Sequence, residues 1–234
     1  MKELLFLVAD LWLMATCWIF GFKMLRNYGN HLLTLEYLVV AVSSTNFLAW
    51  SLLGGDENSP MYHLAYALDA FSRSFGFTLI LVIGLLTVTH GYKPPLWVEV
   101  GATGLAIAGA VVLGRMHSDV LEYDAQHLGL AIFYVATNLL TTAFLAYFTM
   151  RVWKTGATGI AVLTGLATAA GTYVALTYDF FPYPFDDANR TIFYTVALTV
   201  WGCQGAAYYF AYRAMHRHNV ATGRVATQPM EARA

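Results

Sequence analysis

Residues 61–86 read MYHLAYALDAFSRSFGFTLILVIGLL, an apolar run that carries Asp69 and Arg73 in its first half. A helix needs roughly 20 apolar residues to cross the ~30 Å of hydrocarbon in a membrane, and this run is long enough. A charged side chain at membrane depth costs at least ~2.5 kcal/mol, so such residues usually face a protein interior or a cavity. The stretch therefore predicts a transmembrane helix with a polar site on one of its faces.

The composition of the whole chain is that of a membrane protein. Of its 234 residues, 58% are hydrophobic and only 12% are charged, whereas soluble domains contain about 25% charged residues. The net charge is −1, and nucleic-acid binding needs a basic surface to neutralise phosphates. We therefore expect the lipid bilayer as a partner and no nucleic acid.

Apolar runs of spanning length occur seven times, separated by segments rich in Gly, Pro, Asn and Asp that end helices. The pattern predicts an all-α integral membrane protein, a seven-transmembrane-helix bundle formed by one domain, residues 1–215. The polar residues 216–234 are expected to be a disordered cytoplasmic tail. The predicted spans are 3–22, 31–53, 62–89, 96–114, 127–150, 157–178 and 190–213.

The positions of the basic residues predict the orientation. Nine Lys or Arg residues lie after the first, third, fifth and seventh runs, and only three lie on the opposite side, Lys2, Arg115 and Arg190. Cytoplasmic loops carry the excess of basic residues. This bias predicts the N-terminus outside and the C-terminus in the cytoplasm of a multi-pass protein of the cell membrane, which would be the inner membrane in a bacterium.

Small residues are frequent in the run 96–114, which contains Gly101, Gly104, Gly109 and Gly114. Small residues at helical spacing let two helix backbones approach closely within lipid. Close packing inside the bundle is the favoured interpretation. A homo-oligomer formed through this helix is the alternative.

Several polar residues share one depth when positions are counted at about 1.5 Å per residue from the outer end of each span. Asp10, Asn46 and Asp69 should all lie ~10 Å below the outer boundary, with Arg73 one turn deeper. The predicted ligand-binding set lies at or near this level: Asp10, Asn46, Asp69, Arg73, Asn138, Tyr173 and Tyr194.

Two interpretations of this set remain open. In the first, an outward-facing pocket has Arg73 at its floor, where its guanidinium would bind an anionic group. In the second, Asp69 and Arg73, four residues apart on one helix face, neutralise each other and fix how the helices pack. The number of polar groups at one depth favours the pocket slightly.

A second cluster lies on the predicted outer rim, where His63, His117 and His127 occur among several acids. Histidine and carboxylate are ligands for zinc and similar ions. The spacing matches no metal-site pattern, so solvated loop residues are the favoured interpretation. No metal site is predicted, and these histidines are only weak candidates for one.

Cofactor chemistry is limited by what the predicted spans lack. A retinal Schiff base needs a lysine in the last helix, and all four lysines lie at termini or in loops. Transmembrane haem needs histidines near the bilayer centre, and none is expected there. Glu36, near the predicted inner boundary, is expected to extend toward water.

The leading functional hypothesis is therefore a small-molecule transporter or permease. A seven-helix ligand-binding sensor or receptor is the alternative, and a membrane-embedded metal-dependent enzyme using the histidine rim is the second alternative. A transporter should have a cavity that extends past Arg73 toward Glu36 or Glu99, whereas a sensor should have a closed inner half.

Overall fold

A computed structural model describes the chain except for residues 57, 117–124, 179–182, 184, 188–189 and 225–234. Within the described part, the secondary structure is helical, without strands. The helices are α1 (Lys2–Tyr28), α2 (His31–Leu52), α3 (Pro60–Phe71), a π-helical segment (Ser72–Ile80), α4 (Leu81–His90), α5 (Leu96–Leu113), a short 3₁₀ turn (Gly114–Met116), α6 (Ala125–Trp153), α7 (Thr158–Thr177) and α8 (Thr191–Ala221).

Among the residues that the structure describes, six helices are long and apolar enough to cross a membrane: α1, α2, the continuous helix Pro60–His90, the helix Leu96–Met116, α6 and α7. The all-helical prediction is confirmed, and these helices fit a helical membrane protein. The last long helix, α8, is not among them, because tyrosines, threonines and Gln204 dilute its apolar residues. Its place as a seventh span stays a prediction.

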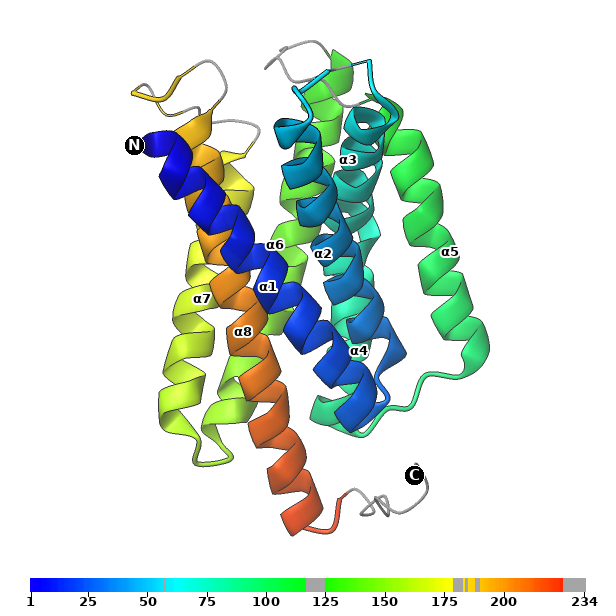
Figure 1. Cartoon of the computed structure of the whole chain (residues 1–234). Helices are drawn as coiled ribbons and strands as arrows, with labels where there is room; N and C mark the ends of the chain where they lie inside the picture. Colours follow the sequence, from blue (N-terminus) through cyan, green and yellow to red (C-terminus); the bar gives the residue numbers. More distant parts are fainter. Residues whose placement is uncertain (57, 117–124, 179–182, 184, 188–189, 225–234) are drawn as a thin grey trace.

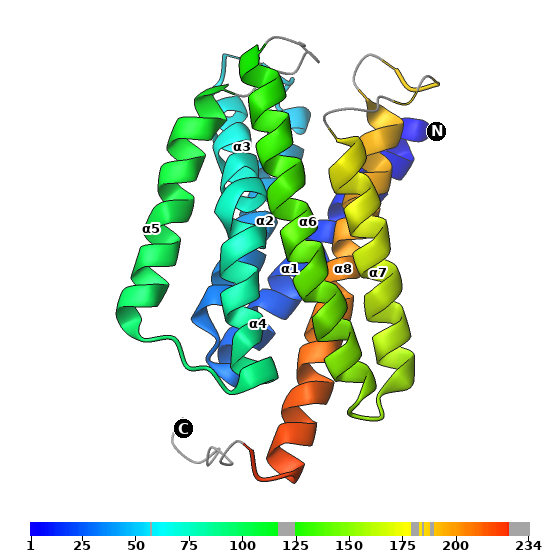
Figure 2. The ribbon, with the colours of Figure 1, turned by 180° about the vertical axis from the view of Figure 1, so that it is seen from behind.

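The helices form a bundle in which α1 runs obliquely between α2 and α8 (Figure 1). Helices α6 and α7 form a hairpin, and α7 packs against α8. Seen from behind, α5 lies at the edge of the bundle beside α3 (Figure 2). The N-terminus lies at one end of the bundle, called here the N-terminal end, and α8 extends beyond the other end (Figure 1).

The helix boundaries follow from local side-chain chemistry. Asn30 precedes α2, and its side-chain oxygen accepts a hydrogen bond from the Leu33 amide at 3.1 Å. Ser59 caps α3 in the same way, and Pro60 occupies the first turn, where its missing N–H costs nothing. Gly91 ends α4 in the left-handed conformation with φ 66°.

The helix that carries Asp69 and Arg73 is not a regular α-helix. It changes to π-helical hydrogen bonding at Ser72 and returns to α-helix at Leu81. Gly76 lies inside this segment, and a Cβ atom there would overlap the Glu36 carboxylate of α2 and lie 3.0 Å from the Phe71 carbonyl oxygen. π-helical turns are rare and often occur at functional sites. The sequence pattern did not predict this segment.

Helix α8 continues to Ala221, past the predicted end of the last span at residue 213. The Met215 side chain is buried, and the Asn219 amide donates a hydrogen bond to the Val88 carbonyl oxygen at 2.7 Å. These contacts with the end of α4 hold the additional turns. The start of the segment predicted to be a disordered tail is therefore helical.

The largest apolar core fills the half of the bundle away from the N-terminal end. Its members come from α1, α2, α4, α6, α7 and α8 and include Met24, Leu33, Leu85, Phe148 and Met215, all at most 1% exposed. This group is called the packed half below. Its most buried members fill the interior on the side opposite the N-terminal end.

The small residues of α5 divide between two environments. Ala106 is fully buried, and a Cβ atom on Gly109 would lie 2.6 Å from the Ser74 hydroxyl oxygen. A Cβ atom on Gly101 or Gly104 would meet nothing within 4 Å. Ala106 and Gly109 therefore pack inside the bundle. Association of two chains through the part of α5 that carries Gly101 and Gly104 stays a prediction.

Candidate functional site

A cavity of about 770 Å³ lies between the helices. Its wall reaches the N-terminal end of the bundle at Glu3 and Gly55, and it extends inward to Glu36 and Tyr208. Tyrosine, tryptophan and phenylalanine side chains make up a large part of the wall. The charged residues in the described part of the wall are Glu3, Asp10, Glu36, Asp69, Arg73 and Arg190.

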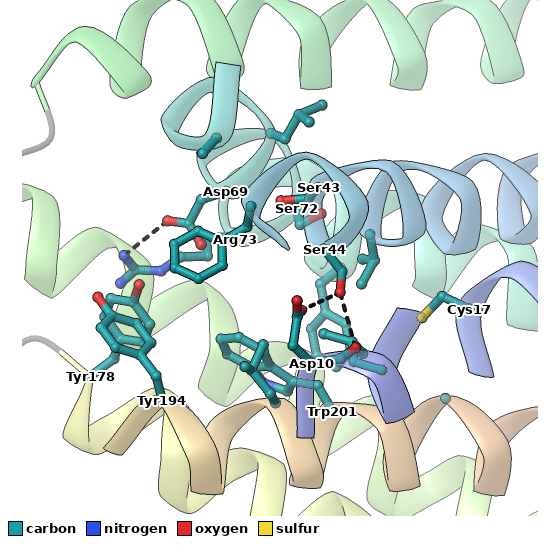
Figure 3. A pocket seen from close by; sticks show the side chains of 18 of the residues that line it. Asp10, Cys17, Ser43, Ser44, Asp69, Ser72, Arg73, Tyr178, Tyr194 and Trp201 are labelled. Atoms are coloured by element: carbon teal, nitrogen blue, oxygen red, sulfur yellow. Dashed lines mark hydrogen bonds and ion pairs between the residues drawn. The ribbon is translucent and has the colours of Figure 1, made fainter. Parts of the chain in front are cut away.

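Arg73 is held on several sides. Its Nη1 atom lies 3.6 Å from Asp69 Oδ2, and the side chain is 11% exposed. The guanidinium carbon lies 4.1 Å from the ring centroid of Tyr134 and 4.0 Å from that of Tyr178. Figure 3 shows the ion pair with Asp69 and the rings of Tyr178 and Tyr194 close to the guanidinium. Cation–π contacts and an ion pair together fix this group within the wall.

Asp10 lies on α1, opposite α2, and is 1% exposed. The Ser44 hydroxyl donates a short hydrogen bond to Asp10 Oδ1 and lies 3.2 Å from the Asp10 carbonyl oxygen (Figure 3). The other carboxylate oxygen, Oδ2, has no hydrogen-bond partner among the described residues. Burying a polar atom without a partner costs about 1–3 kcal/mol, and more for a charged group.

Glu36 is the second buried acid with an unpartnered oxygen. It is 5% exposed, and its Oε2 atom has no hydrogen-bond partner in the described part of the chain. The carboxyl group lies against Gly76 of the π-helical segment and interacts with the Ser72 side chain. The expectation that Glu36 extends toward water is wrong, because α2 presents this side chain to the interior of the bundle.

The structure brings together most of the predicted ligand-binding residues. Asp10, Asp69, Arg73, Asn138 and Tyr194 all line the cavity. The Asn138 amide donates to the Tyr134 carbonyl oxygen at 2.8 Å, one turn earlier on α6.

Asn46 and Tyr173 are not part of this wall. The Asn46 amide donates to the Met61 carbonyl oxygen at 2.8 Å and so joins α2 to α3. Tyr173 is 52% exposed on the outer side of α7. Depth along a helix was the basis for selecting both residues, and depth does not determine which way a side chain points.

The cavity mouth is organised by residues that precede α8. Arg190 donates a hydrogen bond to the Tyr178 carbonyl oxygen at 2.8 Å, and its guanidinium carbon lies 4.3 Å from the Phe193 ring centroid. Asp187 pairs with Lys2 of α1 and accepts a hydrogen bond from the Thr191 amide at 3.0 Å. The Lys2 ammonium, followed by the Thr191 amide, lowers the pKa of Asp187 to about 2.

The histidine rim gains no support as a metal centre. His63 is exposed on α3, and His127 is partly exposed on α6. His117 lies outside the described residues. Among the residues that the structure describes, no group of three or more His, Cys, Asp or Glu side chains could hold a metal ion.

Sequence reasoning missed several wall residues, although α2 carried a usable signal. Its cavity-facing positions Glu36, Val40, Ser43, Ser44 and Phe47 follow helical spacing, which places them on one face. The polar members of this stripe could have identified Glu36 as inward-facing. No protein-family model, curated protein or solved structure matches the chain.

Proposed function

We propose that the protein is a multi-pass transporter of a small organic solute and that the cavity is its binding site. The observation that carries this proposal is the extent of the cavity, which runs from the N-terminal end past Arg73 to Glu36. Its volume suits a small molecule, since ligand pockets occupy ~300–1,000 Å³. Buried polar groups in its wall provide specific contacts.

The proposed topology has seven spans, with α8 as the seventh. The N-terminus lies outside and the C-terminus in the cytoplasm of the cell membrane. The distribution of basic residues supports this orientation, with nine on one side and three on the other. In this orientation the cavity opens to the outside.

The mechanism that fits these features is alternating access. The cavity wall ends near Glu36, and the packed half, with Met24, Leu85 and Phe148, closes the path beyond it. This arrangement corresponds to an outward-facing state, from which helices move to open the other side. The ion pair of Asp69 and Arg73 lies in the cavity wall, so a bound solute would contact it directly.

A ligand-binding sensor is the second candidate, and the packed half is the observation that favours it. A sensor would bind its ligand in the same cavity and keep the inner half closed. The two candidates differ only in whether the bound molecule crosses the membrane.

The test offers a complex mixture of metabolites to the protein. A transported solute is then recognised as a compound that crosses the membrane. Proteoliposomes would be incubated with a small-molecule cell extract, and mass spectrometry would identify what enters the lumen. We expect at least one compound to accumulate with the wild type and not with the Asp69→Asn variant or with empty liposomes. Retention of a compound by the detergent-solubilised protein without accumulation would overturn transport and support the sensor.

A further inference from the structure

The acidic and basic side chains in the cavity wall differ in how far contacts within the protein already occupy them. Four described acids, Glu3, Asp10, Glu36 and Asp69, face two arginines, Arg73 and Arg190. When Asp10 and Glu36 are ionised, the cavity holds more carboxylates than cations and has a negative potential, which its low-dielectric wall strengthens.

The two arginines are already engaged by the protein. Arg73 has Asp69 beside it and a tyrosine ring within 4.1 Å on two sides. Arg190 donates to a backbone carbonyl and packs on the Phe193 ring. An anionic ligand would have to displace these contacts, so our expectation that Arg73 binds an anionic group is no longer favoured.

An unpartnered buried atom is not what separates the acids from the arginines, since the atoms Arg73 Nη1 and Arg190 Nε also lack a hydrogen-bond partner among the described residues. Two of the acids, Asp10 and Glu36, differ in having no oppositely charged partner in the described part of the chain. Asp10 and Glu36 are at least 95% buried, line the cavity, and each keeps one oxygen without a hydrogen-bond partner in the described residues. A buried carboxyl group of this kind either takes up a proton or requires a cation close by. Each of the two residues can therefore hold either a proton or a positively charged group of a ligand.

The remainder of the wall favours an organic cation over a metal ion. Trp201, Tyr37, Tyr178 and Tyr208 also line the cavity. Aromatic faces attract ammonium groups and also provide apolar contact for the rest of such a molecule. A metal ion would instead require several oxygen or nitrogen ligands at one point.

We propose that the cavity binds an organic monocation, a primary or quaternary amine attached to an aromatic or aliphatic group, with Asp10 and Glu36 as its anionic partners. The Ser44 hydroxyl that contacts Asp10 lies eight positions after Glu36 on α2, so the two acids are ~12 Å apart along the helix axis. The ammonium group contacts one of them and is attracted by the other. This inference rests on the proposed function only for the claim that the cation is transported.

Three probes with the same ring and different charge test the proposal on the wild-type protein. They are 2-phenylethylammonium, 2-phenylethanol and 3-phenylpropionate, titrated calorimetrically into the protein in phosphatidylcholine nanodiscs, with empty nanodiscs as the blank. We expect the cation to bind at least tenfold more tightly than the alcohol and the anion to bind most weakly. Equal binding of cation and alcohol would show that the two acids are merely protonated packing groups and would overturn the proposal.

Variants then assign the effect to the two acids. Asp10→Asn and Glu36→Gln keep the shape of each side chain. Each should weaken cation binding at least about tenfold, because one unit charge ~12 Å from the ammonium already has this effect, and the variant that removes the contacting acid should weaken it more. The affinity for 2-phenylethanol should change less than twofold. Glu99→Gln is the matched control, because Glu99 lies outside the cavity wall near His31, and it should leave both affinities unchanged.

A flux measurement separates this proposal from the proposed function. Cation binding without uptake of 2-phenylethylammonium into proteoliposomes would leave the cation site standing and overturn transport of this cation. Preferential binding and uptake of 3-phenylpropionate would support a transporter and overturn the cation site. Unchanged cation affinity in the folded double variant of Asp10 and Glu36 would overturn the assignment of these residues.

Discussion

Arg73 illustrates how one residue can both stabilise the bundle and shape its cavity. Its charge is shared between Asp69 at 3.6 Å and two tyrosine rings on α6 and just after α7. The same contacts join three separate parts of the chain. The two interpretations of the pair, a polar pocket and a packing device, are therefore compatible with each other.

Replacing only Asp69 should destabilise the folded protein more than replacing both Asp69 and Arg73. We expect Asp69→Asn to lower the free energy of unfolding by about 1–3 kcal/mol, because it leaves a largely buried guanidinium without its acid. Replacing both partners, with Asp69→Asn and Arg73→Met, should cost less than the sum of the single changes. Unfolding titrations in mixed detergent micelles measure these differences, and strictly additive effects would contradict the coupling.

At the scale of elements, the π-helical segment and α2 have complementary shapes where they pack together. Gly76 leaves the space that the Glu36 carboxyl group occupies. A larger residue at position 76 must therefore move Glu36 away from its place in the cavity wall.

Gly76→Ala should consequently act through Glu36. We expect it to weaken binding of 2-phenylethylammonium at least about tenfold, as removal of the Glu36 charge does. Adding Gly76→Ala to Glu36→Gln should then change cation affinity little further. Gly101→Ala, at a position with nothing within 4 Å, is the control and should bind like the wild type. A Gly76→Ala variant with normal cation affinity would show that the contact is not required.

The loop before α8 makes a pH-dependent contact with α1. Asp187 pairs with Lys2, and its pKa is lowered to about 2 from an ordinary value of about 3.9. A lowered pKa stabilises the folded state above about pH 4, and this contribution disappears as pH falls toward 2.

The difference in thermal unfolding midpoint between the wild type and Asp187→Asn should therefore be constant above about pH 5 and shrink toward zero between pH 4 and pH 2. Lys2→Met should reproduce this pH profile, because Lys2 is the main cause of the shift. Both residues are solvent-accessible, so the effect should be small and should decrease in high salt. A difference that persists unchanged at pH 2 would contradict this contact.

At the scale of elements, the sequence could predict only part of the fold and of the cavity wall, and the reason is physical. The rise per residue fixes the depth of a side chain, so Asp10, Asp69 and Arg73 could be placed together. The direction of a side chain depends on how the helix is rotated against its neighbours. For this reason depth alone grouped Asn46 and Tyr173 with residues that line the cavity and did not show that Glu36 lines it. The π-helical segment includes the close contact between Gly76 and Glu36, which no local pattern contains. The extension of α8 similarly depends on Asn219 meeting the end of α4.

At the scale of the whole molecule, the orientation decides which compartment the cavity serves. The cavity and the N-terminus lie at the same end of the bundle. The distribution of basic residues is the support for placing this end outside. An inverted protein would present the same cavity to the cytoplasm, and the direction of solute movement would be reversed.

Cysteine labelling in intact cells tests this orientation. In a background with Cys17→Ala and Cys203→Ala, a membrane-impermeant maleimide should label Asn58→Cys in the exposed turn before α3. It should label Lys93→Cys, in the exposed segment between α4 and α5, only after permeabilisation. Ser43→Cys in the cavity wall should react from the same side as position 58, more slowly, and 2-phenylethylammonium should protect it. Labelling of position 93 in intact cells would contradict the proposed topology and indicate the inverted one, with the excess of basic residues outside. Protection of position 43 by 2-phenylethylammonium would still show that the cation occupies the cavity.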